Sequence, residues 1–145
     1  MPACGGMVSD DHLLLEYVEG HSLRDMPLDP VDRERFFTEL RDLILAVHAA
    51  GVAHGDLKRK NNILVGPGGR PYLIDFGTAI SVDADAGPLR RVLFRLMCRT
   101  DLNAWIKLKY RHETDALAAE DAPYSRPTVV EGLARAVRRT WRTVT

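Results

Sequence analysis

The sequence predicts an α+β domain that is largely helical and carries its polar motif on a small β-hairpin. Apolar residues recur at helical spacing before residue 51 and again after residue 88. Between these regions, the short apolar runs NNILV and RPYLIDF flank GPGGR, a turn sequence typical of a hairpin. With 145 residues, the chain (1–145) is long enough to form one domain with its own core.

Composition and cysteine usage narrow the class of protein. Hydrophobic residues make up 46% and charged residues 28% of the chain, with a formal net charge of zero, which argues against a nucleic-acid-binding protein. Cys4 and Cys98 fit neither a metal-binding spacing nor a disulfide framework, so we expect a cytoplasmic location. No segment reaches the roughly 18 apolar residues of a membrane span, and the N-terminus lacks a leader pattern, so neither insertion nor secretion is expected.

The first elements are a strand and a long helix. The run HLLLEYVEG, residues 12–20, is apolar and ends in Glu-Gly, which predicts a buried strand that leads into a turn. Asp29 is a suitable N-cap and Pro30 a suitable first helical residue, and Gly51 predicts the helix end, so a helix is expected over 29–50. Its core-facing stripe is predicted to be Phe36, Leu40, Leu43, Ile44 and Val47.

Helical periodicity returns after Pro88 in three apolar stripes, each of which we expect to face the core. These stripes are Leu89, Val92, Leu93 and Leu96; Leu102, Trp105, Ile106 and Leu108; and Val129, Val130, Leu133, Val137 and Trp141.

The hairpin region concentrates residues suited to phosphoryl transfer. Transfer from a nucleotide requires positioned acids, amides and cations more than covalent chemistry. Asp56 could accept or orient the proton of a hydroxyl, and Lys58 could neutralise the transferred phosphate. Asn61 and Asp75 offer oxygen ligands of the kind Mg²⁺ prefers, and the hairpin is expected to bring these two residues together.

These motifs resemble those of a known family. The run HGDLKRKN, which starts at His54, resembles the catalytic loop of protein kinases with Gly55 in place of their usual Arg, and DFG, which starts at Asp75, resembles their metal-binding motif. The resemblance implies the mostly helical C-terminal lobe of a protein-kinase-like fold that uses ATP and Mg²⁺. The implied organisation is a hinge at 12–20, the catalytic loop and metal site at 52–80, and C-terminal helices at 88–145.

The resemblance also implies roles for single residues. Asp56 and Lys58 would be catalytic, with Lys58 also contacting the nucleotide, while Asn61 and Asp75 would hold the metal and the phosphates. In the hinge, the carbonyl of Glu16 and the amide of Val18 would bind adenine.

Two further residues would act on the loop itself. By the same resemblance, His54 would fix the loop rather than react, and Asp101 would anchor the loop's backbone. Asn62 is interpreted as a neighbour without a role of its own. Arg59 and Lys60 are interpreted as exposed charges that could attract an anionic substrate.

Several kinase features are missing from the sequence. No Gly-rich loop or Val-Ala-x-Lys strand precedes the hinge, so the N-terminal lobe is expected to be largely absent. No Ala-Pro-Glu follows Asp75 in the expected place, which disfavours a peptide-binding platform. Because Gly55 replaces the Arg that pairs with a phosphorylated activation loop, switching by that route is not expected.

Three functions therefore remain open. The first is a phosphotransferase that acts on a Ser/Thr or sugar hydroxyl, resembling compact bacterial Ser/Thr, lipopolysaccharide-sugar, RIO and Bud-type kinases, and Lys58 favours this group. The second is a truncated lobe that serves as a pseudokinase or binding module, with a partner chain completing the N-terminal lobe. The third is a small-molecule kinase of the aminoglycoside or choline type.

Overall fold

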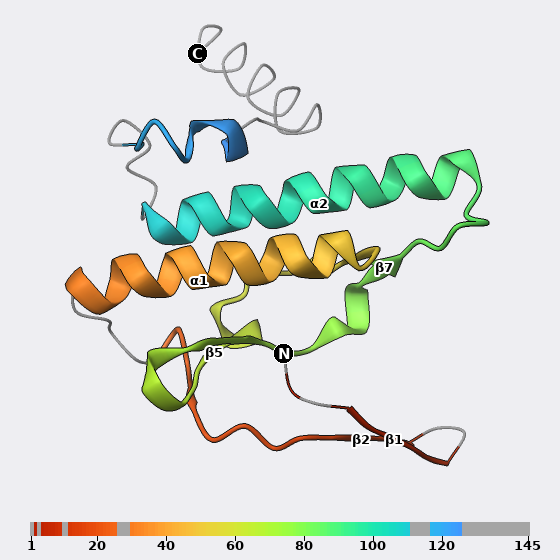
Figure 1. Ribbon diagram of the computed structural model, residues 1–145, viewed down its shortest axis with the longest axis horizontal. Helices are drawn as coiled ribbons and strands as arrows, with labels where there is room; N and C mark the ends of the chain where they lie inside the picture. The colour runs from red at the N-terminus through yellow and green to blue at the C-terminus, as the bar shows by residue number, and fades with distance from the viewer. Residues whose placement is uncertain (1, 3, 10–11, 26–29, 111–116, 126–145) are drawn as a thin grey trace, which may run out of the picture.

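Two long helices and several short strands make up the described part of the protein. The computed structural model describes residues 2, 4–9, 12–25, 30–110 and 117–125. Helices α1 (Pro30–Ala49) and α2 (Pro88–Lys109) lie side by side (Figure 1). Strands β2 (His12–Leu15) and β5 (Ile63–Val65) lie on the side of α1 away from α2, whereas β4 (Val52–Ala53) and β7 (Ile80–Ser81) contact α2. The predicted α+β class is confirmed for these residues, whereas the third predicted stripe, at 129–141, lies outside them.

Helix α1 forms as its sequence predicts. It runs from Pro30 to Ala49, and the predicted N-cap, Asp29, lies outside the described residues. Gly51 ends the helix with a positive φ of 79°, and its N–H donates to the carbonyl of His48 at 2.9 Å, a helix end that glycine forms without strain. The buried face contains four of the five predicted residues and one more aromatic. They are Phe36, Phe37, Leu40, Ile44 and Val47, with Leu43 half-buried beside them.

The strands form three small antiparallel sheets. Strand β1 (Cys4–Ser9) pairs with β2 (His12–Leu15), β5 (Ile63–Val65) pairs with both β3 (His21–Ser22) and β6 (Pro71–Leu73), and β4 (Val52–Ala53) pairs with β7 (Ile80–Ser81). Short 3₁₀ turns lie between or after them: η1 (Lys60–Asn62), η2 (Pro67–Gly69), η3 (Phe76–Thr78) and η5 (Ala122–Tyr124). The strand predicted within 12–20 is therefore present only as far as Leu15, and its partner β1 was not predicted.

The predicted hairpin of β5 and β6 has one core face and one outer face. Ile63, Val65 and Leu73 are buried in the core that α1 also lines, because alternate strand residues point to the same side. Leu64 and Tyr72 pair across the strands on the outer face and are half-buried. The core thus anchors the hairpin while its other face stays accessible.

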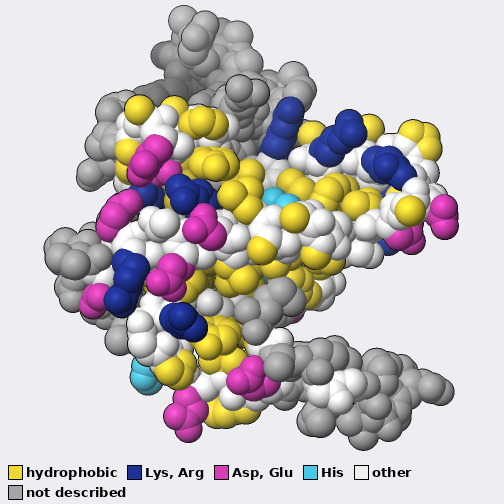
Figure 2. Space-filling model, in the orientation of Figure 1, with side chains coloured by type: hydrophobic (Ala, Val, Ile, Leu, Met, Phe, Trp, Pro, Cys, Tyr) yellow, Lys and Arg dark blue, Asp and Glu magenta, His cyan; other side chains and the backbone are white. Residues whose placement is uncertain are grey.

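Helix α2 joins two of the predicted stripes in one 22-residue helix. Its second stripe is core-facing as predicted, with Trp105 and Ile106 buried. The prediction for the first stripe is wrong, because Leu89, Val92 and Leu93 are 82%, 52% and 46% exposed. The first turns of α2 extend past the end of α1, so α1 does not cover them (Figure 1). Figure 2 shows basic side chains along this part of the helix.

A buried ion cluster attaches the segment 117–125 to the two helices. The ammonium of Lys109 donates to Asp121 Oδ2 at 2.7 Å and to Glu34 Oε1 at 2.6 Å, and the Tyr110 hydroxyl donates to Asp121 Oδ2 at 2.6 Å. Burial raises the pKa of the Asp121 carboxyl, but hydrogen bonds from Lys109 and Tyr110 outweigh this and hold that pKa below its usual range. Burial likewise lowers the pKa of Lys109, but its two carboxylate partners raise it above its usual value.

Candidate active site

A carboxylate of α2 holds the loop that follows β4. Asp101 is fully buried, and its two oxygens accept the backbone N–H groups of His54 and Gly55 at 2.8 and 2.9 Å. The ring of His48 contacts the same carboxylate, with 3.0 Å between Nε2 and Oδ2. The predicted anchoring of the loop by Asp101 is confirmed. Since buried N–H groups without partners are costly, this contact fixes the direction in which the loop leaves the core.

The backbone conformation at position 55 explains why this residue is a glycine. Gly55 has a positive φ of 85°, a region that side-chain-bearing residues rarely adopt. A Cβ at this position would also overlap the end of Met97 and lie 3.0 Å from the carbonyl oxygen of Thr78. The positive φ and the nearby Thr78 carbonyl therefore disfavour a residue with a side chain here. The replacement of Arg by Gly, visible in the motif, thus follows from how tightly the loop packs.

His54 joins the loop to the segment that follows β6. Its Nε2 lies 2.9 Å from the carbonyl oxygen of Ile74, and its ring centroid lies 4.6 Å from that of Phe76. The N–H of Asp56 points to Nδ1 at 3.4 Å, so Nδ1 is the acceptor and Nε2 carries the hydrogen donated to Ile74. Thr78 adds a hydrogen bond from its hydroxyl to the His54 carbonyl at 3.1 Å. The buried ring therefore holds two segments together, as the structural interpretation of His54 predicted.

The amide next to Asp56 belongs to Asn62. Its Nδ2 donates to the backbone carbonyl of Asp56 at 3.0 Å and lies 3.4 Å from Asp56 Oδ2, while the Asn61 side chain is exposed. The interpretation of Asn62 as a neighbour without a role is therefore wrong. The reason is η1, whose single turn from Lys60 to Asn62 directs the second amide inward and the first outward. Metal binding by Asn61 stays a prediction that these contacts do not favour.

Asp75 lies directly after the point where the two segments are joined. The N–H of Ile74 donates to the carbonyl of Asn62 at 3.0 Å, so the backbone places Asp75 one residue beyond a contact with the loop. Its carboxylate is exposed and accepts the N–H of Gly77 at 3.4 Å. Among the described non-glycine residues, only Asp75 has a positive φ, at 60°. Such sparsely populated conformations concentrate at functional sites.

A run of three cations follows Asp56. Lys58, Arg59 and Lys60 are all exposed, and the buried Leu57 separates them from Asp56 along the chain. Arg59 turns back so that its Nε lies 3.1 Å from Asp56 Oδ2. The predicted acid is therefore paired with a cation, and Lys58 remains at the surface beside it.

The predicted adenine-binding residues lie near the other end of the hairpin. Glu16 is exposed and Val18 half-buried, and both lie between β2 and β3. Val18 Cγ1 is 3.4 Å from the position that a Cβ on Gly66 would take, which places Val18 against the hairpin turn. Asp56 and Asp75 are joined to the opposite end, where β5 begins and β6 ends. Adenine binding by Glu16 and Val18 stays a prediction.

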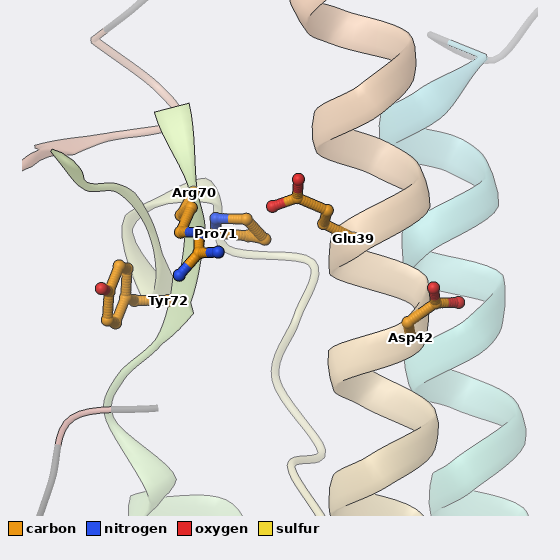
Figure 3. A pocket seen from close by; sticks show the side chains of 5 residues that line it. All are labelled: Glu39, Asp42, Arg70, Pro71 and Tyr72. Atoms are coloured by element: carbon orange, nitrogen blue, oxygen red, sulfur yellow. The ribbon is translucent and has the colours of Figure 1, made fainter. Parts of the chain in front are cut away.

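An open groove of about 560 Å³ lies between α1 and the start of β6 (Figure 3). In Figure 3, Glu39 extends from α1 toward Arg70 and Pro71, whereas Tyr72 points away from the helix. None of the predicted site residues lines this groove. We therefore do not assign the groove to the nucleotide.

Comparison with known proteins supports the kinase resemblance over part of the chain. No family model matches. A rice (Oryza sativa subsp. japonica) protein with the provisional name cyclin-dependent kinase F-2 is 37% identical over 92 residues, 58% of this chain and 28% of that protein. Serine/threonine-protein kinase pkn2 of Myxococcus xanthus is 36% identical over 86 residues, 54% of this chain and 10% of that protein. The KEOPS complex subunit Bud32 of Pyrococcus abyssi is 38% identical over 69 residues, 46% of this chain and 30% of that protein.

The chain thus spans less than a third of the length of these relatives. The first two are kinases by name, and the buried anchor of the loop agrees with the motif that suggested the resemblance. The matched part of the chain is similar to proteins of the protein-kinase-like superfamily.

Proposed function

We propose that the protein is an ATP- and Mg²⁺-dependent phosphotransferase of the protein-kinase-like type, which acts on a Ser/Thr or sugar hydroxyl and has the fold of a kinase C-terminal lobe. The carrying observation is the Asp101 contact, because it fixes a loop in which Asp56 and Asn62 touch. Relatives that are named as serine/threonine kinases support the general activity.

In this proposal, Asp56 accepts or orients the proton of the attacking hydroxyl. The amide of Asn62 holds the Asp56 main chain and approaches its carboxylate, so the acid has a fixed position at the end of the buried loop. Lys58, exposed two residues further on, stabilises negative charge on the transferred phosphate.

The donor set fits Mg²⁺. Asn62 uses its Nδ2 toward Asp56, which leaves the amide oxygen for a cation, and Asp75 offers an exposed carboxylate on the segment bonded to Asn62. Both are hard oxygen ligands. Bound Mg²⁺ would neutralise phosphate charge, and we assign it to Asn62 and Asp75 in preference to Asn61.

A matched pair of asparagine variants tests this assignment. We expect Asn62→Ala to lower Mg²⁺-dependent ATP turnover by about 100-fold or more and Asn61→Ala to leave it within about twofold, since only one amide reaches Asp56. Asp56→Asn and Asp75→Asn should each lower this turnover by about 100-fold or more. Asp85→Asn, an exposed change, is the control. Equal turnover in the wild type and in both acid variants would reject the proposal.

A second candidate is a binding module that requires a partner chain to complete the nucleotide site. The observation that favours it is that the chain spans less than a third of the length of the kinases that it matches. Calorimetric titration with Mg-ATP separates the two candidates. Micromolar binding by the chain alone would count against the module, while binding that appears only with an added partner would favour it.

A small-molecule kinase for cationic substrates is disfavoured. Aminoglycosides and choline carry positive charge, and Lys58, Arg59 and Lys60 would repel them at the mouth of the site. Phosphorylation of either compound in a substrate screen would reinstate this function.

A further inference from the structure

We propose that the acceptor of the phosphate carries a negative charge next to its reacting hydroxyl, and that Arg59 is the residue that selects it. This inference rests on the proposed function and names the substrate class of the same site. The observation that carries it is the contact between the Arg59 guanidinium and Asp56, the residue to which the acceptor must come.

The backbone of Arg59 is held in a fixed position. Its N–H donates to the Asp56 carbonyl at 3.4 Å, and its own carbonyl accepts the N–H of Asn62 at 3.0 Å. From this turn the side chain reaches back, so that Nε lies 3.1 Å from Asp56 Oδ2. The Arg59 side chain is 74% exposed and that of Asp56 only 26% exposed. The contact therefore joins an exposed cation to an acid that is largely shielded from solvent.

An acceptor hydroxyl that binds Asp56 Oδ2 competes with this guanidinium for the same atom. A neutral acceptor would have to separate an arginine from its carboxylate and give the arginine nothing in return. An acceptor with an adjacent carboxylate or phosphate gives Arg59 a new, bidentate partner, and the Asp56 oxygen is then free to take the hydroxyl proton. The exchange of one ion pair for another favours the anionic acceptor.

The neighbouring charges act in the same direction. Lys58 and Lys60 flank Arg59 and are exposed, and the segment 55–62 holds three cations and one acid. These charges raise the local concentration of anions and fade within about 10 Å at 0.1 M salt. A surface ion pair without a role in recognition would stabilise the turn only weakly and would not distinguish one acceptor from another.

The test measures acceptor binding by the full chain in the absence of nucleotide. One arm compares a fluorescein-labelled peptide in which Ser is flanked by Asp and Glu with the same peptide carrying Asn and Gln. A second arm uses glucuronate and glucose as competitors, so the two arms distinguish a peptide from a sugar acid. We expect the charged probe of at least one arm to bind about tenfold tighter than its neutral partner at low salt.

The variants assign this preference to Arg59. Arg59→Gln should reduce the charged-to-neutral ratio to within about twofold of one. Arg59→Lys should retain only part of the ratio, because an ammonium cannot bind an anion in a bidentate way. Arg95→Gln, an exposed change on α2, should retain all of it. Equal binding of charged and neutral probes in both arms would overturn the inference, as would an unchanged ratio in Arg59→Gln. Charge preference without ATP turnover would support the anion-binding role of Arg59 and reject the proposed phosphotransferase function. ATP turnover without charge preference would support the phosphotransferase function and reject the anion-binding role of Arg59.

Discussion

Replacing Asp101 by Asn tests the contact on which the active-site loop depends. The carboxylate accepts two backbone N–H groups, at 2.8 and 2.9 Å, and is in contact with the His48 ring. An Asn of the same shape has one acceptor oxygen, so one buried N–H would face an NH₂ donor. An unsatisfied buried donor costs about 1–3 kcal/mol. Loss of the charge from the remaining hydrogen bond adds roughly 1 kcal/mol.

We therefore expect Asp101→Asn to lower the free energy of unfolding by about 2–4 kcal/mol, a large share of the roughly 5–15 kcal/mol of a typical domain. The midpoint of thermal unfolding should fall by roughly 5–15 °C. Urea unfolding followed by tryptophan fluorescence measures the first quantity, and Asp85→Asn is the matched exposed control. A change below about 0.5 kcal/mol in Asp101→Asn, equal to that of a neutral surface substitution, would refute the view that this carboxylate holds the loop.

Other positions give further predictions. Gly55→Ala should destabilise the fold by about 1–3 kcal/mol in urea unfolding, since it forces a side chain into a positive φ, and a neutral result would remove the backbone reason for glycine. The Asp121 carboxyl has a lowered pKa, so its contribution is complete above about pH 4 and is lost as pH falls through the folded pKa. Lys109 has a raised pKa, so its contribution is complete below about pH 10 and is lost as pH rises through the folded pKa. Urea midpoints across pH should decline at both ends, and Asp121→Asn should flatten the acid limb and weaken the alkaline limb, because Asp121 is also a partner that raises the pKa of Lys109; an unchanged acid limb would contradict the assignment. Burial raises the pKa of the Cys98 thiol to about 11, so in a Cys4→Ser background iodoacetamide at pH 8 should react about 100-fold more slowly than with a free thiol, and rapid labelling would contradict this.

The elements that local patterns specify were predictable from the sequence. Gly51 and the apolar spacing predicted α1 to within a residue at its end, and GPGGR between two apolar runs predicted the hairpin. The resemblance predicted Asp101 as an anchor, and the contact is present because α2 packs beside the loop. These features depend on short-range sequence or on a motif whose geometry is largely self-contained.

The features that were predicted wrongly depend on information that the spacing of residues in the sequence does not contain. The spacing from Asp56 selected Asn61, but a single 3₁₀ turn decides which of the two adjacent amides faces inward, and here that amide is Asn62. Helical periodicity showed an apolar face that includes Leu89 but could not show that α1 ends before reaching it. A pattern indicates which side chains share a face, while the length of the neighbouring element decides whether that face is covered.

The Asp101 carboxylate that holds the loop also affects the thermodynamics of ligand binding. Because the loop takes its shape from a fully buried acid in the helical layer, its conformational entropy is lost when the chain folds and not when a substrate arrives. Differences in affinity among substrates would then report the contacts each one makes, with little added cost for ordering the protein.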